Sequence, residues 1–168
     1  INTTGGTGGL VSVSGATLNA ALVAGAGNIN LTGGNDDLVI NVDQTTATTM
    51  TLSAKRDVII NAKVETTGAG SDILVTADLD GDGSGGVQVT TAGQVVAADA
   101  VTLTGSNLFA TGGLGGVIDS VVIENDGAAN QVQAGGLITI QSGANAPAMA
   151  DIIIDGRIVA AAAEERFT

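Results

Sequence analysis

Residues 73–103 of the chain read ILVTADLDGDGSGGVQVTTAGQVVAADAVTL. Three short apolar runs open in this stretch at Ile73, Val87 and Val101, fourteen residues apart, and Gly, Asp and Ser lie between them. Each run is rich in β-branched residues and alternates in polarity, which is the pattern of a β-strand. Recurrence of one short unit at a regular interval is typical of a solenoid, in which each repeat packs on its neighbours.

The same pattern continues on both sides of this stretch. Similar runs of three to five residues open at Leu10, Ile29, Leu38, Met50, Val58, Val121, Leu137 and Ile152. Secondary apolar positions follow at Val64, Leu79, Val95, Leu108, Val132 and Ile158. Each repeat is therefore expected to hold a main strand, a turn and a shorter second strand. Asn41 and Asn61 both follow an apolar run and are expected to stack as a ladder at one corner.

Composition narrows the class of protein further. The chain has 168 residues, of which 1% are aromatic, and it contains neither His nor Cys. This excludes histidine bases, cysteine nucleophiles, disulfides and metal sites built on thiolate or imidazole. Five basic against 17 acidic residues give a net charge of −12, which argues against a nucleic-acid partner because that partner requires a basic surface. No apolar run reaches the roughly 18 residues of a transmembrane helix.

These observations predict one all-β domain over residues 1–168, a parallel β-helix (β-solenoid). The main alternative is a sandwich or open barrel, but a sandwich core normally contains large aromatic side chains. At the ends, residues 1–9 (INTTGGTGG) are expected to form a flexible leader or a donated edge strand. Residues 159–166 (VAAAAEER) are predicted to form a short helix, since Ala, Glu and Arg favour helices. Such a helix would cap the solenoid, unless the chain simply continues past Thr168.

Three phrases in the central part of the chain carry a family resemblance. They are RDVIINAKVET at 56–66, LVTADLDGDGSGGVQV at 74–89 and GQVVAADAVTLTG at 93–105. The segment from Met50 to Gly112 that contains them resembles the β-helix repeat regions of filamentous haemagglutinin-like exoproteins, the bacterial adhesins of two-partner secretion. The resemblance implies a right-handed parallel β-helix that acts as a long stalk in adhesion or in a matrix.

The sharpest candidate for a ligand site is an acidic loop. Asp78, Asp80 and Asp82 alternate with other residues before a Gly-rich turn, as in the first half of a calcium loop, and alternate carboxylates can converge on one hard cation. Val89 stands where a calcium loop has its closing carboxylate. The alternative is a solvated acidic turn. A weaker candidate is GGNDDL at 33–38, which is similar to the turn of calcium-binding β-rolls but is not repeated.

Catalysis is not expected from the charged residues. Lys55, Arg56 and Asp57 form the basic cluster of the chain, and a β-helix polysaccharide lyase would use such a base beside bound calcium. The net negative charge, however, would repel an acidic polysaccharide, so a local salt-bridged turn is the preferred interpretation. A hydrolase needs paired carboxylates, and the adjacent pair Asp36 and Asp37 would point to opposite faces of a strand.

The sequence therefore predicts a non-enzymatic, secreted structural or adhesive protein of the bacterial surface, forming a stalk, a matrix fibre or a filament subunit. Unpaired terminal strands and neutral faces favour self-association into a homopolymer or stacking with neighbouring repeats, with calcium as a stabilising ion. A glycan- or receptor-binding adhesin module is the alternative. Less favoured are a polysaccharide lyase or hydrolase and an ice-binding protein, because Thr-rich stretches such as residues 45–49 show no constant register.

Overall fold

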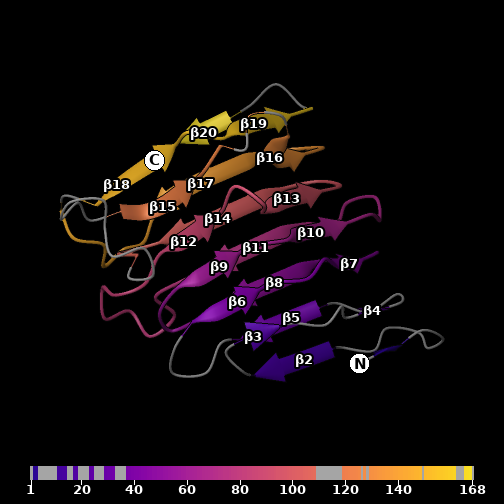
Figure 1. Ribbon diagram of the computed structural model, residues 1–168, viewed down its shortest axis with the longest axis horizontal. Helices are drawn as coiled ribbons and strands as arrows, with labels where there is room; N and C mark the ends of the chain where they lie inside the picture. The colour runs from indigo at the N-terminus through magenta and orange to yellow at the C-terminus, as the bar shows by residue number, and fades with distance from the viewer. Residues whose placement is uncertain are drawn as a thin grey trace.

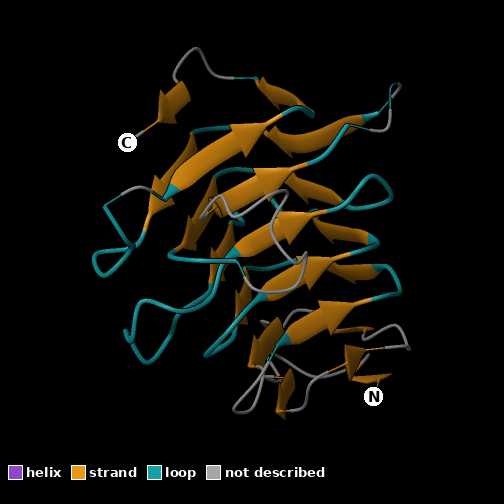
Figure 2. Cartoon of the chain, turned by 60° about the vertical axis from the view of Figure 1, so that its left-hand side comes forward, coloured by secondary structure: helices purple, strands orange, loops and turns teal. Residues whose placement is uncertain are grey.

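The computed structural model is a stack of short parallel strands wound into a coil, a parallel β-helix (Figure 1). It describes residues 37–108, 119–125, 127, 129–148 and 150–161 in full, and the strand backbones at 2–3, 11–14, 17–18, 23–24, 29–32 and 165–167. All regular secondary structure in this described part is β-strand, connected by turns and loops (Figure 2). The predicted fold class is therefore confirmed.

The strands form three parallel sheets. Sheet A has seven strands, β1 (Asn2–Thr3), β4 (Val23–Ala24), β7 (Gln44–Thr46), β10 (Lys63–Thr66), β13 (Gln94–Ala97), β16 (Asn130–Ala134) and β19 (Arg157–Ala160). Sheet B has seven, β2 (Val11–Ser14), β5 (Ile29–Thr32), β8 (Met50–Ser53), β11 (Ile73–Thr76), β14 (Val101–Gly105), β17 (Ile138–Ser142) and β20 (Glu165–Phe167). Sheet C has six, β3 (Thr17–Leu18), β6 (Leu38–Ile40), β9 (Val58–Ile60), β12 (Val87–Val89), β15 (Asp119–Ile123) and β18 (Asp151–Ile154).

Each full coil contributes one strand to each sheet, so the repeat has three strands. The predicted two-strand repeat is wrong in this respect, because Ile73 and Val87 open strands of different sheets in one coil. Val101 is the residue that pairs with Ile73 in the next coil. The fourteen-residue interval is thus half a coil. Paired residues in sheet B, at positions 29, 50, 73, 101 and 138, show that successive coils lengthen up to Ile138, whereas the last coil, from Ile138 to Glu165, is shorter again.

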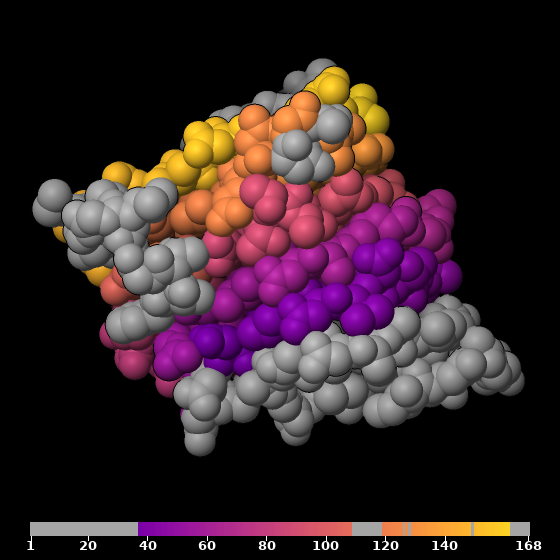
Figure 3. Space-filling view, in the orientation of Figure 1, coloured from indigo at the N-terminus to yellow at the C-terminus, as the bar shows by residue number. Residues whose placement is uncertain are grey.

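The core is a narrow column of aliphatic side chains inside the coil. Met50, Ile73, Val101 and Ile138 are stacked by the sheet B register, and each is at most 1% exposed. Parallel strands about 4.8 Å apart place each side chain over its equivalent in the next coil, so branched aliphatic residues of similar size fill the interior. Figure 3 shows the consequence on the surface: the chain colours form successive bands, because each coil lies against its neighbours in sequence.

Corner positions also repeat between coils. Asn61 donates from Nδ2 to Oδ1 of Asn41 over 2.8 Å, so the predicted asparagine ladder is confirmed. Of the secondary apolar positions, Val64 and Val95 lie in sheet A as expected. Leu79 instead lies in a loop, where it is 51% exposed.

The C-terminal segment does not form the predicted helix. The two ends of residues 159–166 belong to strands β19 and β20, and residues 162–164 lie outside the described part. The sheet register places Ile158 beside Val132 and Ala160 beside Ala134. Tertiary pairing therefore overrides the helix propensity of the alanines, which is a weak local preference. At the other end, residues 2 and 3 form β1 and pair with β4; the rest of segment 1–9 lies outside the described residues.

Candidate metal centre

The acidic loop connects β11 to β12, at the corner between sheets B and C. Its backbone bends sharply because several residues adopt positive φ: Asp78 at 55°, Gly81 at 73° and Gly83 at 85°. Aspartate tolerates the left-handed region better than most residues, and glycine adopts it without a steric cost. The alternation of Asp and Gly in the sequence is what allows this loop to fold back on itself.

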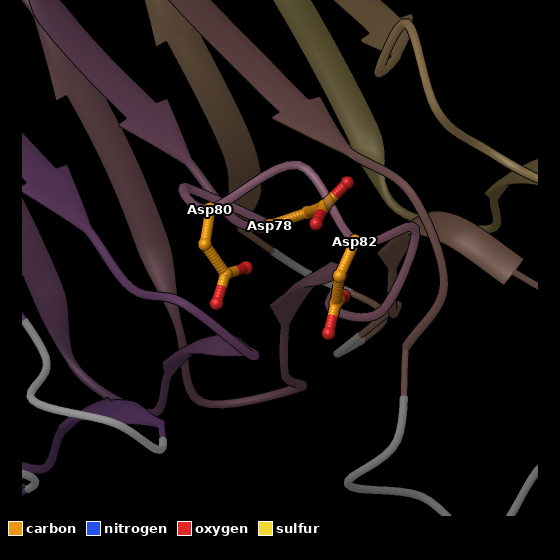
Figure 4. Close-up of side chains that lie close together, drawn as sticks. All are labelled: Asp78, Asp80 and Asp82. Atoms are coloured by element: carbon orange, nitrogen blue, oxygen red, sulfur yellow. The ribbon is translucent and has the colours of Figure 1, made fainter.

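The loop brings the three predicted ligand residues together. One carboxylate oxygen from each of Asp78, Asp80 and Asp82 lies within 4.8 Å of the other two, and Figure 4 shows the three side chains projecting from the same short loop. Asp80 and Asp82 are exposed, whereas Asp78 is half-buried. Carboxylate oxygens are the preferred ligands of calcium, which takes six to eight oxygens. Three carboxylates at this separation fit a hard divalent cation that keeps several waters.

Hydrogen bonds fix the geometry of this loop. Oδ2 of Asp78 accepts a bond of 2.6 Å from the hydroxyl of Ser106, which lies in the next coil. Oδ1 of Asp78 accepts from the Gly83 amide at 3.1 Å, and Oδ1 of Asp82 accepts from the Ser84 amide at 2.8 Å. The least exposed member of the triplet is therefore tied both to its own loop and to the neighbouring coil.

A second loop lies beside the acidic one. A Cβ atom added at Gly83 would lie 2.9 Å from the carbonyl oxygen of Asn145, and one added at Gly81 would lie 2.9 Å from its side-chain nitrogen. Residues 143–148 follow β17, so this contact joins segments far apart in the sequence, which sequence reasoning missed. Val89, at the expected closing position, is a fully buried strand residue and contributes no ligand.

The weaker calcium candidate is used differently. Of residues 33–38, the structure describes Asp37 and Leu38. The guanidinium of Arg56 binds the Asp37 carboxylate through both oxygens, with Nε to Oδ1 at 2.7 Å and Nη2 to Oδ2 at 2.8 Å. The Asp57 amide also donates to Oδ1. The hydrogen bond from Arg56, opposed in part by burial, holds the pKa of Asp37 below its ordinary value. Arg56 therefore compensates the negative charge of Asp37.

Two members of the basic cluster, Arg56 and Asp57, contact other coils. Arg56 reaches back to Asp37 of the preceding coil, whereas Asp57 is fully buried and accepts a 2.8 Å bond from the Gly86 amide of the following coil. Asp37 and Asp57, which precede β6 and β9, therefore each accept an amide from the next coil. We call this arrangement, Asp37 to Asp57 to Gly86, the sheet C corner ladder.

Other corners repeat this use of carboxylates. Asp43 accepts from the Lys63 amide at 2.9 Å, and Asp72 accepts from the Ala100 amide at 3.0 Å. A strand that begins at a corner leaves its first amide outside the regular sheet ladder, and a carboxylate one coil away satisfies it. Part of the acidic excess of this chain is therefore structural rather than a solvated surface.

The threonines of sheet B are in better register than their sequence spacing indicates. Thr51, Thr102 and Thr139 occupy one row, because the register aligns them through β8, β11, β14 and β17. Leu74, which is 39% exposed, interrupts this row. The neighbouring row ends in Gln141 and not in a threonine, so the hydroxyl array is regular in spacing but not in composition.

A small hollow lies at the corner between sheets C and A. It has a volume of about 280 Å³ and is lined by Asn125, Gly127, Ala129, Asp155, Gly156 and Arg157. Its polar lining and the presence of one acidic and one basic side chain distinguish it from the aliphatic core. No aromatic side chain is among its lining residues.

No helix in the described part of the chain is long and apolar enough to span a membrane. Comparison with known proteins does not place the chain in a family: no family model, no curated protein and no solved structure matches it.

Proposed function

We propose that this chain is a non-enzymatic structural element of a secreted bacterial surface protein, a β-solenoid that serves as an adhesin stalk, matrix fibre or filament subunit. The observation that carries the proposal is the uninterrupted stacking of parallel strands in all three sheets. A structure in which every coil supports the next is a rod that extends by repetition. The resemblance of segment 50–112 to filamentous haemagglutinin-like repeats supports the same role and an extracellular location.

The use of the charged residues supports a structural role over an enzymatic one. Arg56, Asp37, Asp57 and Asp72 each engage a partner in another coil. A polysaccharide lyase or hydrolase would instead converge such groups on a groove where the sugar binds. Asp57, which is fully buried, accepts a backbone amide of the next coil, and this contact stabilises the coil.

Calcium binding at the acidic loop is part of the proposal. Asp78, Asp80 and Asp82 would bind the ion, and the carbonyl oxygen of Asn145 lies beside this loop. A divalent cation at this corner would offset two of the three carboxylate charges in a chain of net charge −12 and would stiffen the contact between two coils. The bound ion is therefore expected to act on stability and assembly, not on a reaction.

A second candidate function is glycan or receptor binding, and the polar hollow at Asp155 and Arg157 is the observation that favours it. A hydrogen-bonding sugar or an acidic group would be its natural ligand. The absence of aromatic side chains from its lining weighs against strong carbohydrate binding, which commonly uses an aromatic face to stack against the sugar ring.

The test compares assembly with binding and turnover. The purified chain is sedimented in calcium and in EDTA, screened on a glycan array, and incubated with acidic and neutral polysaccharides. The proposal predicts calcium-dependent pelleting, no glycan signal and no reducing ends released. The double variant Asp80→Asn, Asp82→Asn should lose the calcium dependence, whereas Asp99→Asn, an exposed acidic control, should keep it. Saturable glycan binding that Arg157→Gln abolishes would favour the second function.

A further inference from the structure

A second pair of carboxylates lies far from the acidic loop in the sequence. Asp119 opens β15, and the sheet C register pairs it with Asp151, which opens β18 in the next coil. The pairing shifts between Asp119 and Val121, so the strand carries a bulge at this point. Bulges redirect side chains and are common next to functional sites. Here the bulge places two acidic residues of adjacent coils side by side.

Asp119 differs from Asp37 and Asp57 because one of its buried carboxylate oxygens has no partner among the described residues. The residue is 5% exposed, and within the described part of the chain its Oδ1 atom has no hydrogen-bond partner. In the sheet C corner ladder, by contrast, Asp37 binds Arg56 and Asp57 binds the Gly86 amide. A buried carboxylate oxygen without a partner is costly, so this position requires an explanation.

No lysine or arginine of the described residues compensates the charge of Asp119, and oxygen atoms of the next coil lie beside its neighbour Ser120. Burial raises the pKa of Asp119, and the negative charge of Asp151 raises it further. The hydroxyl of Ser120 donates to the backbone oxygen of Asp151 at 3.1 Å and lies 2.9 Å from the hydroxyl of Ser142. Neither carboxylate forms an ion pair with a described lysine or arginine.

We propose that Asp119 and Asp151 together hold a hard cation of the calcium class between the coil of β14–β16 and the coil of β17–β19. Two carboxylates supply the charge, and an unpartnered oxygen of a buried side chain supplies an open ligand position. Hard divalent cations accept such oxygen ligands, and water completes their coordination. The ion would join two coils as Arg56 joins two coils at Asp37, so the site is an ionic clamp that is distinct from the acidic loop.

The test first replaces two carboxylates of the acidic loop, so that calcium bound at Asp119 and Asp151 can be measured separately from calcium bound at the loop. In the full chain carrying Asp80→Asn and Asp82→Asn, bound calcium is counted by equilibrium dialysis, and the unfolding midpoint is measured with calcium and with EDTA. The proposal predicts one bound calcium per chain and a higher midpoint in calcium. Adding Asp119→Asn or Asp151→Asn should abolish both effects, whereas adding Asp99→Asn, an exposed acidic control, should leave both unchanged.

Two results would overturn the proposal. One is the absence of bound calcium in the loop variant, and the other is binding that Asp119→Asn and Asp151→Asn leave intact. If calcium has no effect while the midpoint rises as the pH falls from 7 to 5, and Asp119→Asn removes that rise, the pair shares a proton and binds no cation. Because Asp151 is exposed, its variant keeps the test informative even if Asp119→Asn does not fold.

Discussion

Replacement of Asp57 by alanine tests the role of carboxylates at the corners of this solenoid. Asp57 is fully buried, and its Oδ1 atom accepts the Gly86 amide of the next coil at 2.8 Å. The variant Asp57→Ala leaves that amide buried without an acceptor. Hydrogen bonds to charged groups contribute about 1.5 to 3 kcal/mol, and a buried donor left unsatisfied costs a similar amount. We therefore expect Asp57→Ala to lower the free energy of unfolding by about 2 to 3 kcal/mol.

Two further variants separate the hydrogen bond from the charge. Asp57→Asn keeps a carbonyl acceptor at the same place and should cost less than Asp57→Ala. Asp155→Ala removes an exposed carboxylate and should change stability by no more than about 0.5 kcal/mol. Urea unfolding followed by far-UV circular dichroism is the suitable assay, because the chain contains no Trp or Tyr. The reasoning would be refuted if Asp57→Ala were as harmless as Asp155→Ala.

Three other predictions concern the core, the loss of stability at acid pH and a corner glycine. Leu103 is fully buried in the column of sheet B, so Leu103→Ala should cost about 2 to 5 kcal/mol in urea unfolding; a loss below 1 kcal/mol would mean that the column is loosely packed. The pKa of Asp37 is lowered mainly by Arg56, so its contribution to stability is present above the ordinary carboxyl pKa and lost as the pH falls through the lowered value. In Arg56→Gln the free energy of unfolding should therefore fall less between pH 5 and pH 2 than in the unmodified chain. An equal fall in both proteins would contradict this. Gly85 has a φ of 128°, and a Cβ there would clash with the Arg56 carbonyl oxygen, so Gly85→Ala should lower the thermal midpoint far more than Gly70→Ala, where the space is open.

The strands could be predicted from the sequence because the local pattern and the tertiary structure agree. Two such runs, Ile73 to Val75 and Val87 to Val89, are strands in which the first and third side chains are fully buried. The number of strands per coil could not be predicted from spacing alone. The interval from Ile73 to Val87 spans the single acidic loop, whereas the equal interval from Val87 to Val101 contains strand β13 and two corners.

The wrong prediction of a helix over residues 159–166 has a different physical origin. Residues 159–166 are good helix formers in isolation, but a strand in a stacked coil gains a full ladder of hydrogen bonds from the coil below it. Ala160 lies beside Ala134, which shows that a small residue is what this corner of the coil accommodates.

The candidate sites also differ in whether the sequence could predict them. Asp78, Asp80 and Asp82 are close in the sequence, so their convergence could be predicted from loop spacing. The pair of Asp119 and Asp151, and the contact of Asn145 with the acidic loop, depend on the register between coils of different length. These contacts form between coils that are far apart in the sequence, so no local motif indicates them.

Electron microscopy of the purified chain, once in calcium and once in EDTA, tests the central proposal most directly. A structural solenoid stabilised by calcium should appear as rods or filaments of a single solenoid width in calcium, and these should shorten or disappear in EDTA. Compact, monodisperse particles of the same size in both solutions would contradict calcium-dependent assembly and would make glycan or receptor binding at the hollow beside Arg157 the function to pursue.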